Sequence, residues 1–332
     1  MVLSSARDRT PDPRPPKISV LVPSYNYARF LPQTIESILA QDHESFEILI
    51  RDDASPDHSA EIIRHYAERS PKIRYHLHAT NQGMVANWNW CLAHARSEYV
   101  KFCFGDDLLA TTDALSRYAA MLDEHPGAAL AGSARLLIDD NSQITGLWDD
   151  HPAGIHDGPE SVARCLSSRK NLIGEPTSVM FRRASAARGF DTSLRQIVDL
   201  EMWCHLLLGG QLVYTSKPLC CFRRHPAQQS AVNKQNRVGE RELLLLMDRY
   251  VDHPAIQRSV RPGSFAHRQL LFRHSYYAQK AARALVAGRL PAHWFWICWF
   301  LHKITRPGKN LRRKLRIWQH ALTATRHRPA SP

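Results

Sequence analysis

Tyr99-Val-Lys-Phe-Cys-Phe-Gly-Asp-Asp107 places two carboxylates directly after an apolar run. The apolar part, residues 99–104, is typical of a buried strand. Side chains that follow a parallel strand face the crevice in which α/β proteins bind ligands. Two carboxylates there suit a hard divalent cation that bridges to substrate phosphates. An acidic turn capping a helix that starts near Thr111 explains the same residues, so the pair alone leaves both interpretations open.

Strand-like apolar runs alternate with stretches of helical spacing from residue 17 to about 138. We predict strands at 17–22, 46–50, 73–78, 99–104 and 130–138, and helices at 31–41, 59–69, 84–95 and 113–124. This alternation indicates a parallel sheet with crossover helices. Farther along we expect helices at 158–166, 199–208 and 240–250, and strands at 178–182 and 211–215. The predicted class is α/β, with a mostly parallel central sheet flanked by helices.

The net charge of +13 is concentrated in the last part of the chain. Residues 261–332 contain 15 Lys and Arg and no Asp or Glu, which leaves 29 basic and 31 acidic residues before them. Such asymmetry points to a polyanionic surface, either nucleic acid or anionic lipid. Seven cysteines without a CxxC pair indicate buried thiols in a reducing compartment. Residues 1–16 are polar and proline-rich, and we expect a disordered lead-in.

Four polar clusters fall at or just after the ends of the first four predicted strands. They are Pro23-Ser24-Tyr25-Asn26, Asp52-Asp53-Ala54-Ser55-Pro56-Asp57, Asn81-Gln82-Gly83 and Gly105-Asp106-Asp107. Each alone is more often a turn, because these are the ordinary turn residues. The carboxyl ends of parallel strands, however, meet at one edge of a doubly wound sheet. Four clusters in succession at this edge therefore predict a shared ligand site.

These clusters, in this order, resemble the motifs of the family 2 glycosyltransferases, which have the Rossmann-like GT-A fold. The resemblance covers roughly residues 17–230. It implies a nucleotide-sugar donor bound by the N-terminal half and sugar transfer with inversion, normally with a divalent metal. By position, Asp53 would accept the N–H of the base, and Asp52 would support its loop. The other residues expected beside the donor are Pro23, Tyr25, Asn26, Asn81 and Gly83.

The resemblance makes Asp107 the metal ligand and Asp106 the partner of a ribose or sugar hydroxyl. A carboxylate can approach the two donor phosphates only through a cation, such as Mg²⁺ or Mn²⁺. Residues 222–225 resemble the family's closing Tyr-Arg-x-His motif. Arg224 would then contact phosphate, and His225 would ligate the cation or a phosphate oxygen. A purely structural histidine is the alternative.

The segment 198–203, Val-Asp-Leu-Glu-Met-Trp, resembles the family's acidic segment at the start of a helix. By that alignment Asp199 is the general base that deprotonates an acceptor hydroxyl, with Glu201 as the reserve candidate and Trp203 on the acceptor side. Partial burial that raises the pKa of a carboxylate toward neutrality suits a base. A helix N-cap is the alternative for Asp199. Glu175 is predicted on the acceptor side, or in a simple Gly-Pro turn.

The basic C-terminal part carries an amphipathic pattern. Leu311, Leu315, Trp318 and Leu322 lie at helical spacing, with basic residues largely off that stripe. Next to the aromatic run at 292–301, this is typical of a helix at an anionic membrane surface. A helix packed on the catalytic domain is the alternative. Nucleic acid would require stacking aromatics on the basic face, so we predict no nucleic-acid partner.

The sequence predicts a catalytic domain at 17–235, with a nucleotide-sugar half at 17–110 and an acceptor half at 111–235, followed by a helical basic region at 236–332. We expect an inverting, metal-dependent glycosyltransferase in surface-polysaccharide synthesis, peripheral on the cytoplasmic face of the membrane. Its donor would be a UDP- or dTDP-sugar and its acceptor a glycan or lipid-linked sugar. A nucleotidyltransferase is an alternative, and the departures at Val198 and His205 leave open an inactive membrane-associated scaffold.

Overall fold

The computed structural model of the protein describes residues 15–226, 228 and 238–259. The predicted lead-in up to residue 14 and the predicted amphipathic helix around Leu311 lie outside the described residues. Both therefore stay predictions.

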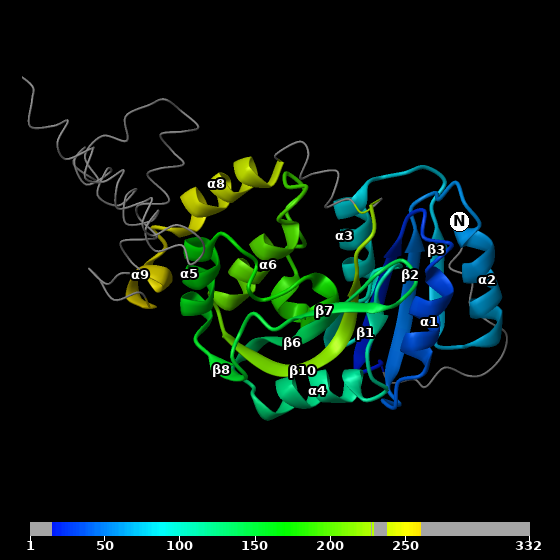
Figure 1. The fold of residues 1–332 in the computed structure, drawn as a ribbon, viewed down its shortest axis with the longest axis horizontal. Helices are drawn as coiled ribbons and strands as arrows, with labels where there is room; N and C mark the ends of the chain where they lie inside the picture. The colour runs from blue at the N-terminus through cyan, green and yellow to red at the C-terminus, as the bar shows by residue number, and fades with distance from the viewer. Residues whose placement is uncertain (1–14, 227, 229–237, 260–332) are drawn as a thin grey trace, which may run out of the picture.

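Four parallel strands joined by three crossover helices form the first half of the sheet. The strands are β1 (Ile18–Ser24), β2 (Phe46–Asp52), β3 (Ile73–Leu77) and β4 (Tyr99–Phe102), and the helices are α1 (Leu31–Leu39), α2 (Ser59–Arg69) and α3 (Met84–His94). The strands lie in the order β3-β2-β1-β4, and all three pairings are parallel. This half lies on the right of Figure 1, in blue to cyan. The alternating sequence pattern predicts each of these elements to within two residues at either end.

The second half of the sheet is mixed. Its strands are β5 (Leu108–Leu109), β6 (Ala128–Ile138), β7 (Ile144–Trp148), β8 (Gly154–His156), β9 (Val179–Arg182) and β10 (Gln211–Arg223). The order continues from β4 through β9, β6 and β10 to β5, with β7 on β6 and β8 on β10. β9 runs antiparallel to both β4 and β6, whereas β6 and β10 are parallel. The predicted α/β class is confirmed, and an uninterrupted parallel arrangement is limited to β1–β4.

Three strands, β5, β7 and β8, were not predicted from the sequence, and β10 was predicted only in its first part. β5 has 2 residues and β8 has 3, which is too short for a periodic signal. β10 is 13 residues long and changes register between Thr215 and Cys220. Pro218 lies within this interruption and has no N–H for a ladder. The sequence pattern therefore indicates a strand that ends near Thr215. In the structure β10 continues past the interruption to Arg223, which lies beside Asp106 and Asp107.

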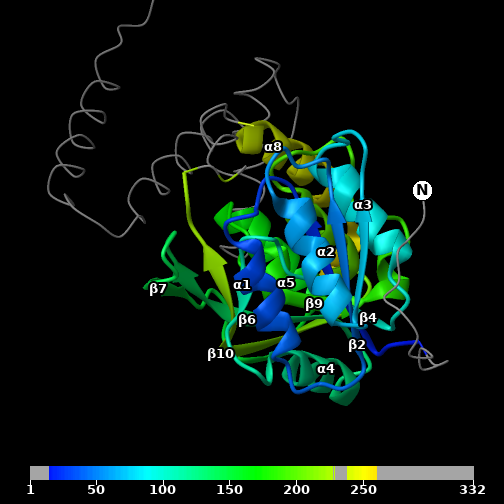
Figure 2. The ribbon, with the colours of Figure 1, turned by 90° about the vertical axis from the view of Figure 1, so that its right-hand side faces the viewer.

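Helices cover both faces of the sheet (Figure 2). The later ones are α4 (Ala114–Glu124), α5 (Gly158–Ser168), α6 (Val198–Leu207), α8 (Val238–Tyr250) and α9 (Pro254–Ser259). One apolar core contains residues of α1, α2 and α4, and a second contains residues of α3, α5, α6 and α8. Ile48 and Ile50 of β2 belong to the first core and Leu49 to the second, because alternate residues of a strand face opposite sides.

The C-terminal described helices belong to the same packed unit as the sheet. Leu246 and Met247 of α8 and Ile256 of α9 are buried in the second core. The packed unit thus includes described residues beyond 235, the predicted end of the catalytic domain. A search of the described helices finds no span with the length and apolar character needed to cross a membrane.

Candidate active site

A cavity of about 1480 Å³ opens at the carboxyl ends of the parallel strands. It brings together 11 of the predicted site residues: Pro23, Tyr25, Asn26, Asp53, Asn81, Gly83, Asp106, Glu175, Asp199, Arg224 and His225. Among the described residues, four predicted ones lie outside its lining: Asp52, Asp107, Glu201 and Trp203. The predicted convergence of polar clusters at one sheet edge is therefore observed, and the four exceptions each have a structural explanation.

The two carboxylates after β2 hold the loops of the N-terminal half. Asp53 accepts the N–H of Gln82 at 3.0 Å and that of Gly83 at 2.8 Å, which ties the end of β2 to the start of α3. Gly83 has a φ of +90°, a left-handed backbone conformation that residues with a side chain rarely adopt. Asp52 instead accepts the N–H and the hydroxyl of Ser55 at 2.9 and 2.5 Å. Asp53 faces the cavity, and Asp52 stabilises the turn beneath it.

Asp106 and Asp107 point in different directions. Asp106 lines the cavity, and its Oδ2 lies 3.0 Å from Nε2 of His225. Asp107 is 1% exposed and accepts the hydroxyl of Thr177 at 2.5 Å and the N–H of Arg223 at 2.9 Å. Burial, and the neighbouring charge of Asp106, raise the pKa of Asp107 well above its ordinary range. Asp107 is thus a buried support for β10 rather than a side chain of the cavity.

The sequence gives the cation to Asp107 and a hydroxyl to Asp106, and this assignment stays a prediction. The side chain that meets His225 in the cavity is that of Asp106. Adjacent carboxylates in a turn look equivalent in sequence. Only the packing of Thr177 and Arg223 against Asp107 shows that Asp107 faces the core and that Asp106 faces the cavity.

Asp106 and His225 are suitable ligands for a cation that also binds substrate. Mg²⁺ is usually held by one or two carboxylates together with phosphate oxygens and waters, instead of by an all-protein cage. Among the described residues, no group of three or more His, Cys, Asp or Glu side chains is arranged to hold a metal. The pair therefore fits a cation shared with a diphosphate and does not fit a free-standing metal centre.

The two arginines of the closing motif have different surroundings. Arg223 is fully buried and donates to the backbone oxygens of Asp106 and Asp139 at 2.8 and 2.7 Å. Arg224 is exposed and lines the cavity, so its guanidinium can reach an anionic ligand. Arg223 is one residue that sequence reasoning missed. Its buried guanidinium holds the turn that carries Asp106.

Asp199 lies in the first turn of α6, which begins at Val198 with Ile197 at the cap position. The alternative interpretation of Asp199 as an N-cap is therefore wrong. Its Oδ1 accepts a hydrogen bond from the N–H of Leu200 at 2.8 Å, and its Oδ2 accepts one from Nδ2 of Asn171 at 2.9 Å. Burial raises the pKa of Asp199 to about 7, and the charge of Glu175 adds to this shift. A half-buried carboxylate with this pKa is suited to accept a proton near neutral pH.

Glu201 and Trp203 are structural residues of α6. Glu201 is 1% exposed and binds Arg188 at 2.6 Å, Arg249 at 2.7 Å and the hydroxyl of Tyr250 at 2.9 Å. These contacts join α6 to α8 outside the cavity. The reserve assignment of Glu201 as a base is thus incompatible with its position. Trp203 also lies outside the cavity lining, and its acceptor-side role stays a prediction.

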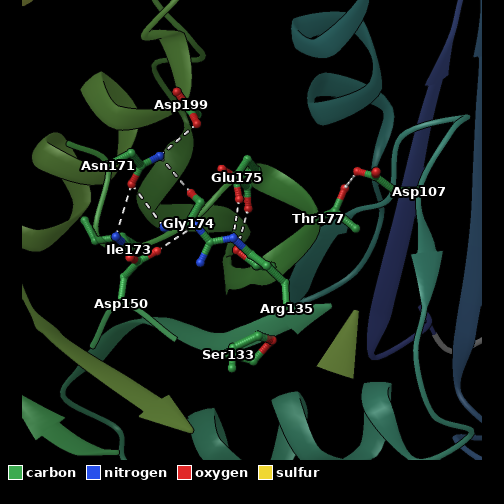
Figure 3. Close-up of polar contacts among 12 residues, drawn as sticks. Asp107, Ser133, Arg135, Asp150, Asn171, Ile173, Gly174, Glu175, Thr177 and Asp199 are labelled. Carbon is green, nitrogen blue, oxygen red and sulfur yellow. Dashed lines mark hydrogen bonds and ion pairs between the residues drawn. The ribbon is translucent and has the colours of Figure 1, made fainter. Parts of the chain in front are cut away.

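Trp203 contacts the backbone of the loop that carries Glu175. It is fully buried in the second core, and its indole N–H donates to the oxygen of Gly174 at 2.9 Å. Gly174 precedes Glu175, whose carboxylate pairs with Nε of the buried Arg135 at 2.5 Å (Figure 3). Arg135 also pairs with Asp150 at 3.0 Å. Glu175 is followed directly by a short 3-10 turn, η1 (Pro176–Ser178), so the predicted turn and the predicted cavity position are both present.

Several cavity residues carried no motif in the sequence. They are Arg169, Lys170, Asn171 and Arg195. Arg169 ends α5 with a φ of +61°, in the left-handed conformation that commonly terminates helices. This reversal turns the following residues toward the cavity. Neither helical nor strand periodicity marks such loop residues, which explains why sequence reasoning missed them.

Comparison with known proteins shows the family and the fold of the chain. The model of the family "Glycosyl transferase family 2" matches residues 19–190, slightly more than half of the chain. An uncharacterized protein of Mycobacterium tuberculosis, MT1568, is 32% identical over 232 residues, which are 65% of this chain and 69% of that protein. The putative teichuronic acid biosynthesis glycosyltransferase TuaG of Bacillus subtilis is 28% identical over 199 residues, 60% of this chain and 75% of TuaG.

Solved structures share the fold at low sequence identity. Staphylococcus aureus TarS 1–349 in complex with UDP-GlcNAc is 19% identical, with a TM-score of 0.61 over 86% of this chain and 79% of that one. The mannosyltransferase PcManGT of Pyrobaculum calidifontis, in complex with GDP-Man and Mn²⁺, is 19% identical, with a TM-score of 0.57 over 92% and 85%. The chain belongs to glycosyltransferase family 2 and has the GT-A fold.

Proposed function

We propose that this glycosyltransferase transfers a sugar with inversion from a nucleotide-sugar to an acceptor hydroxyl, with the help of a divalent cation. One observation carries the proposal: Asp199, with its pKa raised to about 7, lines the same cavity as the Asp106–His225 pair. A base and a candidate cation site therefore share one substrate space. This is the arrangement that a single displacement at the anomeric carbon requires.

In this mechanism Asp199 is the base. Its ionised carboxylate takes the proton of the acceptor hydroxyl as the oxygen attacks the anomeric carbon, and the nucleoside diphosphate leaves on the opposite side. Arg224 lines the cavity, which supports a contact between its guanidinium and the phosphates of the leaving group. Asp106 and His225 would hold Mg²⁺ or Mn²⁺, which supplies positive charge to the diphosphate. The roles of Asp199, Arg224 and His225 are those that the family resemblance implies. The proposed carboxylate ligand of the cation differs, because Asp106 takes the place of Asp107.

We propose a UDP- or dTDP-sugar as the donor. Asp53 lines the cavity, and each of its carboxylate oxygens accepts one backbone N–H. A carboxylate oxygen has room for a second donor, such as the ring N–H of a pyrimidine base. The complexes of TarS with UDP-GlcNAc and of PcManGT with GDP-Man support a nucleotide-sugar but leave the base open. Tyr25, Asn26, Asn81 and Gly83 lie beside this position.

For the acceptor we propose a glycan or a lipid-linked sugar of a surface polysaccharide. The name of TuaG supports a polysaccharide context. Arg169, Lys170 and Arg195 line the cavity near Asp199, and their positive charges are compatible with a phosphate on the acceptor. We also propose attachment at the inner face of the cytoplasmic membrane through the basic C-terminal residues. Equal sedimentation with anionic liposomes of full-length protein and of a variant ending at Ile256 would exclude this attachment.

A panel of UDP-, dTDP- and GDP-sugars tests the proposed function. Purified full-length protein is incubated with each donor and with Mg²⁺ or Mn²⁺, and release of the nucleoside diphosphate is measured. We expect release from a pyrimidine donor and its loss with EDTA. Release that is equally fast in EDTA would contradict the cation, and the absence of release and of binding for every donor would contradict the nucleotide-sugar. Neither the nucleotidyltransferase nor the scaffold alternative is favoured by an observation in the site.

A further inference from the structure

Asn171 is held in one orientation by its own loop. Its side-chain oxygen accepts the N–H of Ile173 at 3.1 Å and that of Gly174 at 3.0 Å. Its Nδ2 donates to the oxygen of Gly174 at 2.9 Å and to Oδ2 of Asp199 at 2.9 Å. Figure 3 shows the amide between the loop and the carboxylate. Both protons of the amide are therefore used, and one of them points at Asp199.

The loop itself is fixed by the core. The oxygen of Gly174 also accepts the indole N–H of the fully buried Trp203. Gly174 has a φ of +123°, and a Cβ there would lie 2.0 Å from Oγ of Ser178. Only glycine fits such a position, because of both the backbone conformation and the close approach. The amide of Asn171 is thus anchored to the core through Gly174.

We propose that Asn171 is a positioning residue, which orients the carboxylate of Asp199 toward the acceptor hydroxyl and keeps it available as a base. This inference rests on the role of Asp199 in the proposed function. With Leu200 on Oδ1 and Asn171 on Oδ2, each oxygen of Asp199 has one fixed donor. The carboxylate cannot rotate without losing one of them. Its remaining lone pairs are then the ones available to a substrate hydroxyl.

Burial raises the pKa of Asp199, whereas the hydrogen bond from Asn171 lowers it. Burial and the charge of Glu175 raise the pKa of Asp199, whereas the amide of Asn171 and the N–H of Leu200 lower it. The charge of Glu175 is itself paired with Arg135. Other charged groups around Asp199 are Arg169, Lys170 and Arg195 in the cavity, and Glu201 with Arg188 and Arg249 on the far side of α6. A substitution of Asn171 replaces none of these groups, so the effect of the lost amide can be measured separately.

The test compares two variants of Asn171 with a matched control. Asn171→Asp keeps an oxygen for Ile173 and Gly174 but removes the donor to Asp199, and Asn171→Ala removes both. The control is Asn89→Ala in α3. Asn89 also ties down a loop, by donating to the oxygen of Phe190 at 3.0 Å and accepting its N–H at 2.7 Å. The Asn89 amide is not paired with Asp199, so its loss reports on loop stability alone.

The first readout is the pH dependence of turnover of the best donor. Because a base must be ionised, the rate falls below the pKa of Asp199. Loss of one hydrogen bond to the ionised form should shift this acidic limb upward by about one pH unit in Asn171→Ala, and further in Asn171→Asp because of its added negative charge. The KM for the donor should stay unchanged. Asn89→Ala should lower the melting temperature and leave the limb in place. An unshifted limb in both Asn171 variants would overturn the inference.

The second readout does not depend on turnover. The pKa of Asp199 in the folded protein lies above its ordinary 3.8, so its contribution to stability is greatest below about pH 4 and is lost as the pH rises to about 7. The difference in melting temperature between wild type and Asp199→Asn, followed with pH, reports this titration. In an Asn171→Ala background the loss should continue to higher pH. An identical difference curve would refute the inference and leave the proposed base untouched, whereas full activity of Asp199→Asn would refute the base and, with it, the inference.

Discussion

The proposed donor edge and the proposed acceptor side of the cavity are built in different ways. At the donor edge, which comprises the residues after β1, β2 and β4, the polar side chains follow strands of the parallel sheet. On the proposed acceptor side, residues 169–178 and 191–199, they lie on the loops between α5, β9 and α6 and in the first turn of α6, which contains Asp199. The strand ends are placed by the sheet itself. The loops are placed by buried side chains, among them Arg135 and Trp203. Substitutions at the two sides should therefore have different effects on activity and on stability.

The largest effect is expected for the base on the acceptor side. Asp199→Asn keeps the shape of the side chain and its hydrogen bond from Leu200 but removes the proton acceptor. We expect transfer to slow by about 100- to 10,000-fold, with donor affinity unchanged in a binding titration. A variant that still transfers at the wild-type rate would exclude Asp199 as the base.

The second effect separates two neighbours at the donor edge. Asp106→Asn should lower turnover by about 100-fold or more, because it removes a proposed cation ligand, and should raise the Mn²⁺ concentration needed for half-maximal rate. Asp107→Asn should instead lower stability by about 1–3 kcal/mol through its contacts with Thr177 and Arg223. Denaturant unfolding and a Mn²⁺ titration of both variants measure this. The opposite pattern would restore the assignment to Asp107.

The pH profile of the wild type should show the raised pKa of Asp199. Since that pKa is about 7, the rate should fall about tenfold for each pH unit below it, as the base becomes protonated. This acidic limb should be missing from the residual activity of Asp199→Asn. A limb of the same position in that variant would assign the titration to another group.

The smallest effect is expected beneath the acceptor side. Trp203→Phe keeps an aromatic ring in the core and removes the donor to the oxygen of Gly174. We expect a loss of about 1–3 kcal/mol of stability and a fall of a few-fold in transfer, with donor hydrolysis by water and donor affinity affected less. Phe181→Leu, in the same core, serves as the control for packing. Equal effects of both variants on transfer would show that the Gly174 contact is not needed.

The difference between the two sides also explains what could be predicted. The four parallel strands, their helices and the polar clusters behind them follow from local patterns of period 2 and 3.6. The roles of adjacent residues do not, because Asp106 and Asp107 differ only in which of them Thr177 and Arg223 cover. Glu201 was a plausible reserve base in sequence, yet its pairing with Arg188 and Arg249 buries it outside the cavity.

The sequence by itself determined the α/β class, the family and the edge of the sheet at which ligands bind, because alternating apolar runs and turn residues are local signals. Only the tertiary structure decided that Asp106 meets His225, that Asp199 lies inside the first turn of α6, and that Asn171 holds it there. These facts depend on contacts between residues far apart in the chain. Such contacts form only when the core brings strands, helices and loops together, and no local pattern encodes them.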